Sequence, residues 1–292
     1  MALSPTHRFG QIICDLLEVA LAPLLREFAD ENGLYLDKTG ARRARRGRKV
    51  SWIDAYGNTH NLDYVIERDG SETQIGTPVA FIETAWRRYT KHSRNKAQEI
   101  QGAILPLVAR YQKAVPFIGV ILAGDFTSGA LTQLKSQGFG VVYFPYDAVM
   151  TAFDRVGLNA RFDEGTPDAV VADKVLAWQA LPQGKRVQLA QEVLERGSRD
   201  VNEFMQSLRA AAQRRIEMIV VLPLHGSACE LTTVDQAIAF VEDYKMGGTP
   251  APILRYEIEI RFNNGNRYTA ALSDKASALQ FLREYDPPKA LR

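Results

Sequence analysis

Two acidic residues have types and surroundings that could support metal chemistry. Asp63 lies in NLDYVIE and Glu83 in GTPVAFIETAW, twenty residues further on, and both segments have the pattern of β-strands. If the two strands pair, their carboxylates can converge at one end of a sheet. Hard cations such as Mg²⁺ prefer oxygen ligands, so such a pair can hold a divalent cation against a phosphodiester. The alternative is that each acid is an ordinary surface residue of its strand.

Positive charge is concentrated in two segments, although the net charge of the chain is only +2. The run ARRARRGRK carries six cations within nine residues, namely Arg42, Arg43, Arg45, Arg46, Arg48 and Lys49. A second group, Arg87, Arg88 and Lys91, follows Glu83 and is interleaved with aromatic residues. Both groups are expected to contact phosphates, and the first is expected to be mobile until an anion neutralises it. A solvated loop and the start of an amphipathic helix are the alternative interpretations.

The first 150 residues combine helical and strand patterns. Apolar spacing predicts helices over residues 8–30 and 97–111 and a shorter one through 130–134. KVSWIDAY and THNLDYVIE flank Gly57-Asn58, which favours a hairpin, and the later strands are VAFIET, PFIGVILAG and GVVYFPY. The order predicts an α/β domain over residues 1–150, with a mixed central sheet flanked by helices.

The rest of the chain is predicted to form two further parts. Residues 151–213 have helical patterns and are interpreted as a connector. Residues 214–292 contain an internal repeat with a shift of 41 residues, and each copy is predicted to fold as strand, turn, strand and helix. The aligned pairs are Leu231 and Leu272, Ala237 and Ala278, Phe240 and Phe281, and Tyr244 and Tyr285. Such a duplicated ββα domain could form one four-stranded sheet.

The two acids, the basic helix after them and the strand–helix–strand unit that follows resemble the core of the PD-(D/E)XK nuclease superfamily. The resemblance implies that Asp63 and Glu83 bind Mg²⁺, for which Mn²⁺ can substitute, and that the metal activates the attacking water. The usual lysine of that superfamily lies two residues after the second acid, where this chain has Ala85. Some members supply the lysine from the neighbouring helix, with a glutamine or glutamate beside it, and NKAQEIQ offers Lys96 with Gln98 and Glu99. We therefore expect Lys96 to take this catalytic role, with Arg87, Arg88 and Lys91 as the other candidates.

The resulting hypothesis is a Mg²⁺-dependent endonuclease that hydrolyses phosphodiester bonds of double-stranded DNA, as a restriction or defence enzyme does. Symmetric cutting of a duplex needs two active sites, which favours a homodimer, and the repeat would serve target recognition or dimerisation. Because Ala85 replaces the lysine, a catalytically silent DNA-binding module is the alternative. A structural or regulatory protein that shares only the fold is a third hypothesis.

Other functional classes lack their sequence signals. No apolar run approaches 18 residues and no secretory segment is recognisable, which predicts a protein that neither spans a membrane nor is exported. Cys14 and Cys229 lie in apolar surroundings and are interpreted as reduced residues of a cytoplasmic protein. Walker loops, dinucleotide fingerprints, zinc quartets and nucleophile elbows are not found in the sequence.

Overall fold

The computed structural model describes residues 4–112, 114–224, 226–244, 255–263 and 265–283. The chain divides into two compact units, Met1–Ala212 and Gln213–Arg292, each with its own sheet and hydrophobic core. In chain order the first unit contains α1 (Pro5–Glu31), β1 (Tyr35–Lys38), β2 (Val50–Ile53), β3 (Thr59–Leu62), β4 (Tyr64–Arg68), β5 (Thr77–Arg87), the 3-10 turn η1 (Thr90–His92), α2 (Ser93–Arg110), β6 (Phe117–Gly124), α3 (Ser128–Ser136), β7 (Gly140–Pro145), α4 (Tyr146–Arg155), α5 (Asp168–Ala180), α6 (Gln183–Arg196) and α7 (Ser198–Ala212).

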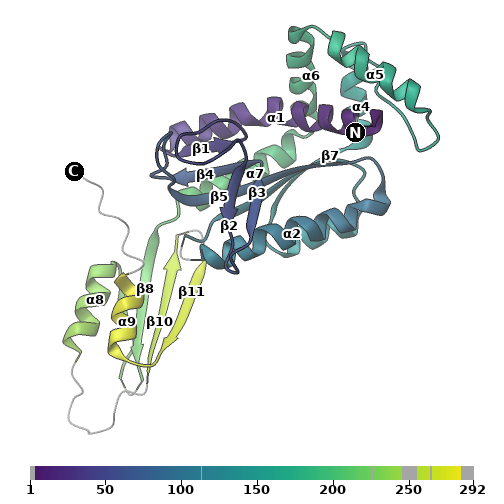
Figure 1. Cartoon of the computed structure of the whole chain (residues 1–292). Helices are drawn as coiled ribbons and strands as arrows, with labels where there is room; N and C mark the ends of the chain where they lie inside the picture. The colour runs from purple at the N-terminus through teal and green to yellow at the C-terminus, as the bar shows by residue number, and fades with distance from the viewer. Residues whose placement is uncertain (1–3, 113, 225, 245–254, 264, 284–292) are drawn as a thin grey trace. The chain divides into compact units, whose positions relative to one another are not determined.

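The first unit is built around a five-stranded sheet in the order β1-β4-β5-β6-β7 (Figure 1). The pairs β1–β4 and β4–β5 are antiparallel, whereas β5–β6 and β6–β7 are parallel. Every residue of β6 is buried, because this apolar strand lies in the interior of the sheet with side chains packed on both faces. This arrangement confirms the predicted α/β fold with a mixed central sheet flanked by helices.

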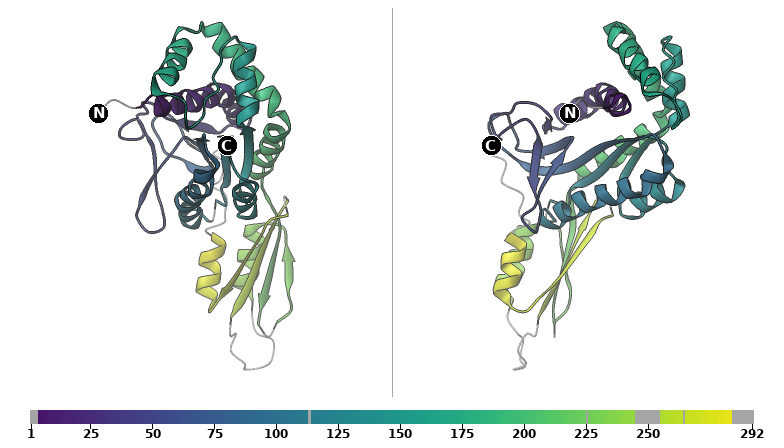
Figure 2. Two further views of the ribbon diagram at one scale, coloured as in Figure 1. Left: turned by 90° about the vertical axis from the view of Figure 1, so that its right-hand side faces the viewer. Right: turned by 45° about the vertical axis from the view of Figure 1, so that its right-hand side comes forward.

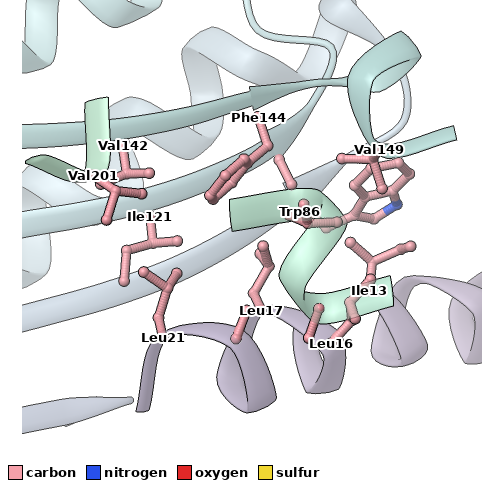
Figure 3. Close-up of a cluster of buried hydrophobic side chains, with 14 of the residues drawn as sticks. Ile13, Leu16, Leu17, Leu21, Trp86, Ile121, Val142, Phe144, Val149 and Val201 are labelled. Atoms are coloured by element: carbon pink, nitrogen blue, oxygen red, sulfur yellow. The ribbon is translucent and has the colours of Figure 1, made fainter. Parts of the chain in front are cut away.

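Two separate hydrophobic cores cover the two faces of this sheet. Helix α1 packs on one face together with α4 to α7, and α2 and α3 pack on the other (Figure 2). On the α1 face, Leu21 points toward Ile121 of β6, and Leu17 points toward the side of the sheet that carries Trp86 and Phe144 (Figure 3). The opposite core also includes Trp52 from the hairpin β2–β3, which forms a two-stranded sheet of its own. The sheet is therefore buried on both sides at its centre.

Two local features differ from the sequence-based expectation. The strand β1 was not predicted, and it pairs with β4 along the edge of the main sheet. The predicted strand THNLDYVIE is divided into two, because β3 ends at Leu62 in the hairpin and β4 begins at Tyr64 in the main sheet. Asp63 is the single residue between the two strands.

Residues 151–213 do not form a separate connector, which corrects the predicted domain division. Helices α5 and α6 contact α1, and α7 contacts β6 and β7. The ring of Phe204 on α7 meets Phe117 of β6 edge-on, with ring centroids 5.1 Å apart. Gly119 leaves room for this contact, since a Cβ there would lie 2.6 Å from the Phe204 ring. These helices complete the core of the first unit.

The second unit contains β8 (Ile216–Pro223), β9 (Cys229–Leu231), α8 (Val234–Asp243), β10 (Tyr256–Phe262), β11 (Arg267–Leu272) and α9 (Lys275–Arg283). Its strands form one antiparallel sheet in the order β11-β10-β8-β9. Ala237 and Ala278 are fully buried, and Phe240 and Phe281 pack partly buried against the same core. Tyr285 and the segment 246–252 between the copies lie outside the described residues.

Among the helices of the described chain, none combines the length and the apolar character that crossing a bilayer requires.

The packing of α7 leads to a stability prediction. Phe204→Ala should lower the free energy of unfolding of the first unit by about 3–5 kcal/mol, because it leaves a cavity beside Phe117. Tryptophan fluorescence during denaturant unfolding measures this change selectively, since Trp52, Trp86 and Trp178 all belong to this unit. The neighbouring exposed substitution Glu203→Ala is the control and should change stability by about 0.5 kcal/mol or less. Equal effects of the two substitutions would contradict a core role for α7.

Candidate metal centre

Asp63 is held in place by the strand opposite it. Tyr64 pairs with Ile82, so Asp63 lies one position beyond the last pair of the β4–β5 ladder and faces Glu83. Its Oδ2 accepts hydrogen bonds from the Thr84 backbone N–H at 2.7 Å and from the Thr84 hydroxyl at 2.6 Å. In a longer β4, a backbone carbonyl would accept the hydrogen bond from the Thr84 N–H. Here the Asp63 carboxylate accepts it instead. Its Oδ1 has no hydrogen bond to a described residue and is available for another ligand.

Glu83 lies in the middle of β5 and is largely buried. Its side chain is 20% exposed, and Oε2 is a buried oxygen without a hydrogen-bond partner among the described residues. Burial raises the pKa of this carboxyl to about 8, with the negative charge of Asp63 acting in the same direction and Lys96 opposing the shift. A buried oxygen of this kind, beside a second carboxylate, would be satisfied by a cation.

Lys96 reaches this pair from the first turn of α2. Its ammonium Nζ lies 4.0 Å from Glu83 Oε1 and 2.7 Å from Glu99 Oε1. Glu99 also lies 3.7 Å from the Arg87 guanidinium, so it connects the two cations at the edge of the site. Ala85 is buried in the apolar core beneath α2, where a lysine would have to enter a hydrophobic environment. The approach from the helix agrees with the predicted geometry, while the catalytic role of Lys96 stays a prediction.

Asp63 and Glu83 are the two carboxylates that could hold a metal ion at this place. Within the described residues, no group of three or more His, Cys, Asp and Glu side chains is arranged to bind a metal ion. Mg²⁺ normally keeps several water ligands and takes one or two carboxylates together with substrate phosphate oxygens. The unpartnered Glu83 Oε2, with the Asp63 carboxylate opposite it, fits that mode of binding. They do not form a closed structural site.

The basic run 42–49 is anchored at two of its arginines, which corrects our expectation for these residues. The Arg42 side chain is 1% exposed, and its Nη1 lies 2.6 Å from Glu67 and 2.8 Å from Asp37. Arg45 pairs with the same Asp37 at 3.0 Å and donates to the carbonyls of Lys38 and Gly47. Arg42 and Arg45 are therefore occupied by protein acceptors and are not available to bind phosphate.

The other cations of this run differ from the two anchored arginines. The side chains of Arg43, Arg46, Arg48 and Lys49 are exposed. None of these four side chains forms an ion pair or a hydrogen bond with another described residue, and the contact of Arg43 with Glu72 is made by its backbone N–H. They remain candidates for contacts with an anionic partner.

Arg88 and Lys91 are also committed to contacts within the protein. Arg88 donates to the Phe162 carbonyl, pairs with Asp125 at 2.8 Å and lies 3.8 Å from the centroid of the Tyr146 ring. Lys91 forms an ion pair with Glu164. These contacts hold the segment after β5 against the loop that follows α4. Arg88 is thereby removed from the predicted phosphate-binding set, whereas Lys91 remains exposed and could exchange its partner.

Three further residues surround the acids, and of these the sequence reasoning named only Glu99 for the site, as a neighbour of Lys96. Thr84 and Glu99 fix Asp63 and Lys96 respectively, and Cys14 of α1 approaches from the other side. Burial raises the pKa of the Cys14 thiol to about 11, with a further contribution from the charge of Asp63. A hydroxyl next to Glu83 and an acid three residues after Lys96 were visible in the sequence. Their partners were not, because each contact depends on how the strands and the helix meet.

The comparisons with known proteins provide no family assignment. No protein-family model matches the chain, and no curated protein matches it. Among solved structures, the chain is similar to the crystal structure of "Protein of Unknown Function AF1548", with 13% identity and a TM-score of 0.29. That similarity covers 65% of this chain and 98% of the other. A TM-score this low supports no argument about fold or function.

The raised pKa of Glu83 predicts a pH-dependent difference between wild type and Glu83→Gln. Between pH 4.5 and 8 the unfolded chain ionises this carboxyl while the folded protein keeps it protonated, so the wild type loses stability as pH rises. Glu83→Gln avoids this loss, and its stability relative to wild type should increase by at most about 1.4 kcal/mol for each pH unit across this window. Denaturant unfolding in chelator at pH 4 and pH 9 measures the difference. Glu27→Gln, at an exposed position of α1, serves as the control, and a constant difference across this range would contradict the assignment.

The two hydrogen bonds from Thr84 to Asp63 predict an effect on metal binding. Thr84→Val removes the hydroxyl donor, leaves the carboxylate less restrained and should weaken Mn²⁺ binding on the order of 10- to 100-fold. Thr84→Ser keeps the donor and should retain most of the affinity. Calorimetric titration of the two variants tests this, and equal affinities would show that the hydroxyl does not position Asp63.

Proposed function

We propose that this protein is a Mg²⁺-dependent endonuclease that hydrolyses phosphodiester bonds of DNA. The observation that carries the proposal is the buried, unpartnered Oε2 of Glu83, which lies beside Asp63 with the Lys96 ammonium 4.0 Å from the other oxygen of Glu83. Two carboxylates and one cation gathered at the end of β4 are suited to a divalent ion and a phosphate group.

In this proposal each side chain has a defined task. When bound, the metal supplies Lewis acidity and a water of lowered pKa as the nucleophile. Asp63 and Glu83 hold it, and Asp63 keeps its orientation because Thr84 restrains Oδ2. Lys96 donates from its ammonium toward the phosphate oxygens or the attacking water and neutralises charge that develops there. Glu99 holds Lys96 on the solvent side of the site, at 2.7 Å.

The finer features of the fold belong to the same proposal. We assign the first unit to a restriction-endonuclease-like core on the order of its strands and the position of its acids, and the function to restriction or defence. The second unit is proposed to be a duplicated ββα domain. Its register supports this, because the shift of 41 residues relates Ile219 to Ile260, and these two residues pair across β8 and β10. A twofold axis through that pair would exchange the copies.

Three remaining parts of the proposal concern partners and location. We propose double-stranded DNA as the substrate and a homodimer as the active form, since one site per chain cuts one strand. The second unit would then recognise the target or join the two chains. We also propose a cytoplasmic location for such an enzyme.

A catalytically silent DNA-binding module remains the second candidate. It is favoured by Ala85 and by the position of Lys96, whose ammonium is closer to Glu99 than to Glu83. In a silent module the Lys96–Glu83 interaction would only neutralise a buried acid. The two candidates differ in hydrolysis and not in DNA binding.

Plasmid cleavage with and without Mg²⁺ separates these functions. We expect cleavage by the wild type, a loss of at least about a hundredfold in Asp63→Asn and Glu83→Gln, and little change in their DNA binding. Lys96→Ala should lower the cleavage rate on the order of 10²- to 10³-fold while metal affinity is retained. Lys135→Ala is the matched control, because this lysine is exposed in the last turn of α3 and belongs to neither of the two basic segments. Metal and DNA binding without cleavage would favour the silent module, and no metal binding would refute both the enzyme and the metal centre.

A further inference from the structure

The loop between β1 and β2 ends next to the acids. In the β2–β3 hairpin, Val50 pairs with Leu62, so Lys49 and Asp63 are the next residues beyond the end of that ladder. In the main sheet, Lys38 pairs with Tyr64 at the end of β1. The loop 39–49 therefore begins directly after the residue opposite Tyr64 and ends directly before the residue opposite Leu62. Both of its ends lie beside Asp63. The backbone N–H of Gly40 donates to the Arg48 carbonyl at 2.8 Å and closes the loop at its base.

An internal network of charges fixes this loop. Arg42 donates to both oxygens of Glu67 and to the carbonyls of Ser71 and Gln74, and it pairs with Asp37. The side chains of Glu67 and Asp37 are 0% and 3% exposed, so the acids that hold the loop belong to the interior of the sheet edge. The guanidinium of Arg42 also lies 4.2 Å from the centroid of the Tyr35 ring. We call this network the Arg42 clamp.

Arg45 extends the clamp across the loop. It shares Asp37 with Arg42 and donates to the carbonyls of Lys38 before the loop and Gly47 near its end. Two of the six cations are thus neutralised by two buried acids. The repulsion that would otherwise expand the run is reduced, and the four remaining cations project from an anchored backbone.

We propose that Arg43, Arg46, Arg48 and Lys49 form a phosphate-binding surface, held by the Arg42 clamp, that follows the DNA backbone. Lys49 lies next to the bond cut at Asp63 and Glu83, and Arg43 lies beside Glu72, beyond the other end of β4. This inference rests on the proposed function and adds to it the residues that hold the substrate. Guanidinium groups match phosphate oxygens in a bidentate manner, and the lysine adds a point charge nearest to the acids. A loop that is anchored before binding loses less conformational entropy when DNA arrives.

The test is a comparison of DNA binding by two charge-matched variants of the full chain. In the first, Arg43, Arg46, Arg48 and Lys49 are replaced by Ala. In the second, four exposed cations from other elements are replaced, namely Arg26, Lys135, Arg155 and Lys185. Binding to a short labelled duplex is measured over a series of salt concentrations, with Ca²⁺ in place of Mg²⁺ so that the duplex stays intact.

The first variant should bind at least about tenfold more weakly at low salt, and its salt slope should be smaller by up to about 3.6, since each phosphate contact contributes roughly 0.9. The control variant removes the same charge and should change both quantities little. Equal effects in the two variants would overturn the proposal, because they would show that only net charge matters.

Two further measurements separate this proposal from the proposed function. The first variant should retain Mn²⁺ affinity and a near-normal kcat at saturating DNA, with the loss confined to KM. If the wild type neither binds metal nor cleaves DNA, the proposed function fails whatever the loop does. If the wild type cleaves and the first variant cleaves with unchanged KM, only the loop proposal fails.

The clamp itself is tested through Arg45. Arg45→Gln leaves Arg42 with both of its acids, so the fold should be retained, but the link from Lys38 to Gly47 is lost. We expect a several-fold weaker DNA affinity without the change in salt slope that loss of a phosphate contact produces. A fall in slope close to about 0.9 would show instead that Arg45 itself binds phosphate, which would overturn the division of the loop into clamp and surface.

Discussion

The constraint on which this structure depends is the burial of one carboxylate beside another. Glu83 cannot leave the site, because it is fixed in the middle of β5 beside the buried Val120 of β6. Asp63 cannot leave either, since the Thr84 hydroxyl and backbone hold it. Two adjacent carboxylates in a poorly hydrated place cannot both be charged without compensation, and the pKa of Glu83 at about 8 expresses that cost. The surrounding helix supplies one ammonium, which lies at 4.0 Å and only partly offsets the charge.

A good part of this site could be predicted from the sequence. The sequence predicted that Glu83 lies on a strand and that Lys96 lies at the start of a helix, because β5 and α2 both have strong apolar patterns. For Lys96 that pattern is the helical spacing over residues 97–111. These patterns could not reveal the break at Asp63. The residues on both sides of it are apolar and β-forming, and only the packing of Leu62 and Tyr64 into different cores separates the two strands.

The basic run shows why charge patterns are harder to interpret than apolar ones. Six cations in nine residues have the composition of a solvated or nucleic-acid-binding loop, and nothing local distinguishes Arg42 from Arg43. The difference arises from Glu67, which lies 25 residues away and becomes a neighbour only when β1 and β4 pair. The helices after residue 150 were misjudged for a similar reason. Their apolar faces were recognisable, but the helix against which α5 and α6 pack is α1, which lies more than a hundred residues earlier in the sequence.

The single residue between β3 and β4 has a consequence for how this protein can change. The hairpin ladder ends at Leu62 and the sheet ladder at Tyr64, so Asp63 is a spacer of fixed length between two independently anchored strands. Inserting a residue there would turn one of the two strands over, because side chains alternate between the faces. The tip of the hairpin is also fixed, because the buried Asp54 accepts hydrogen bonds from the backbone N–H groups of Tyr56 and Asn58, but the Tyr56 side chain itself is exposed. A probe is therefore better attached at the side chain of position 56, which is 81% exposed and whose replacement changes neither the Asp54 turn nor the length of the spacer at Asp63.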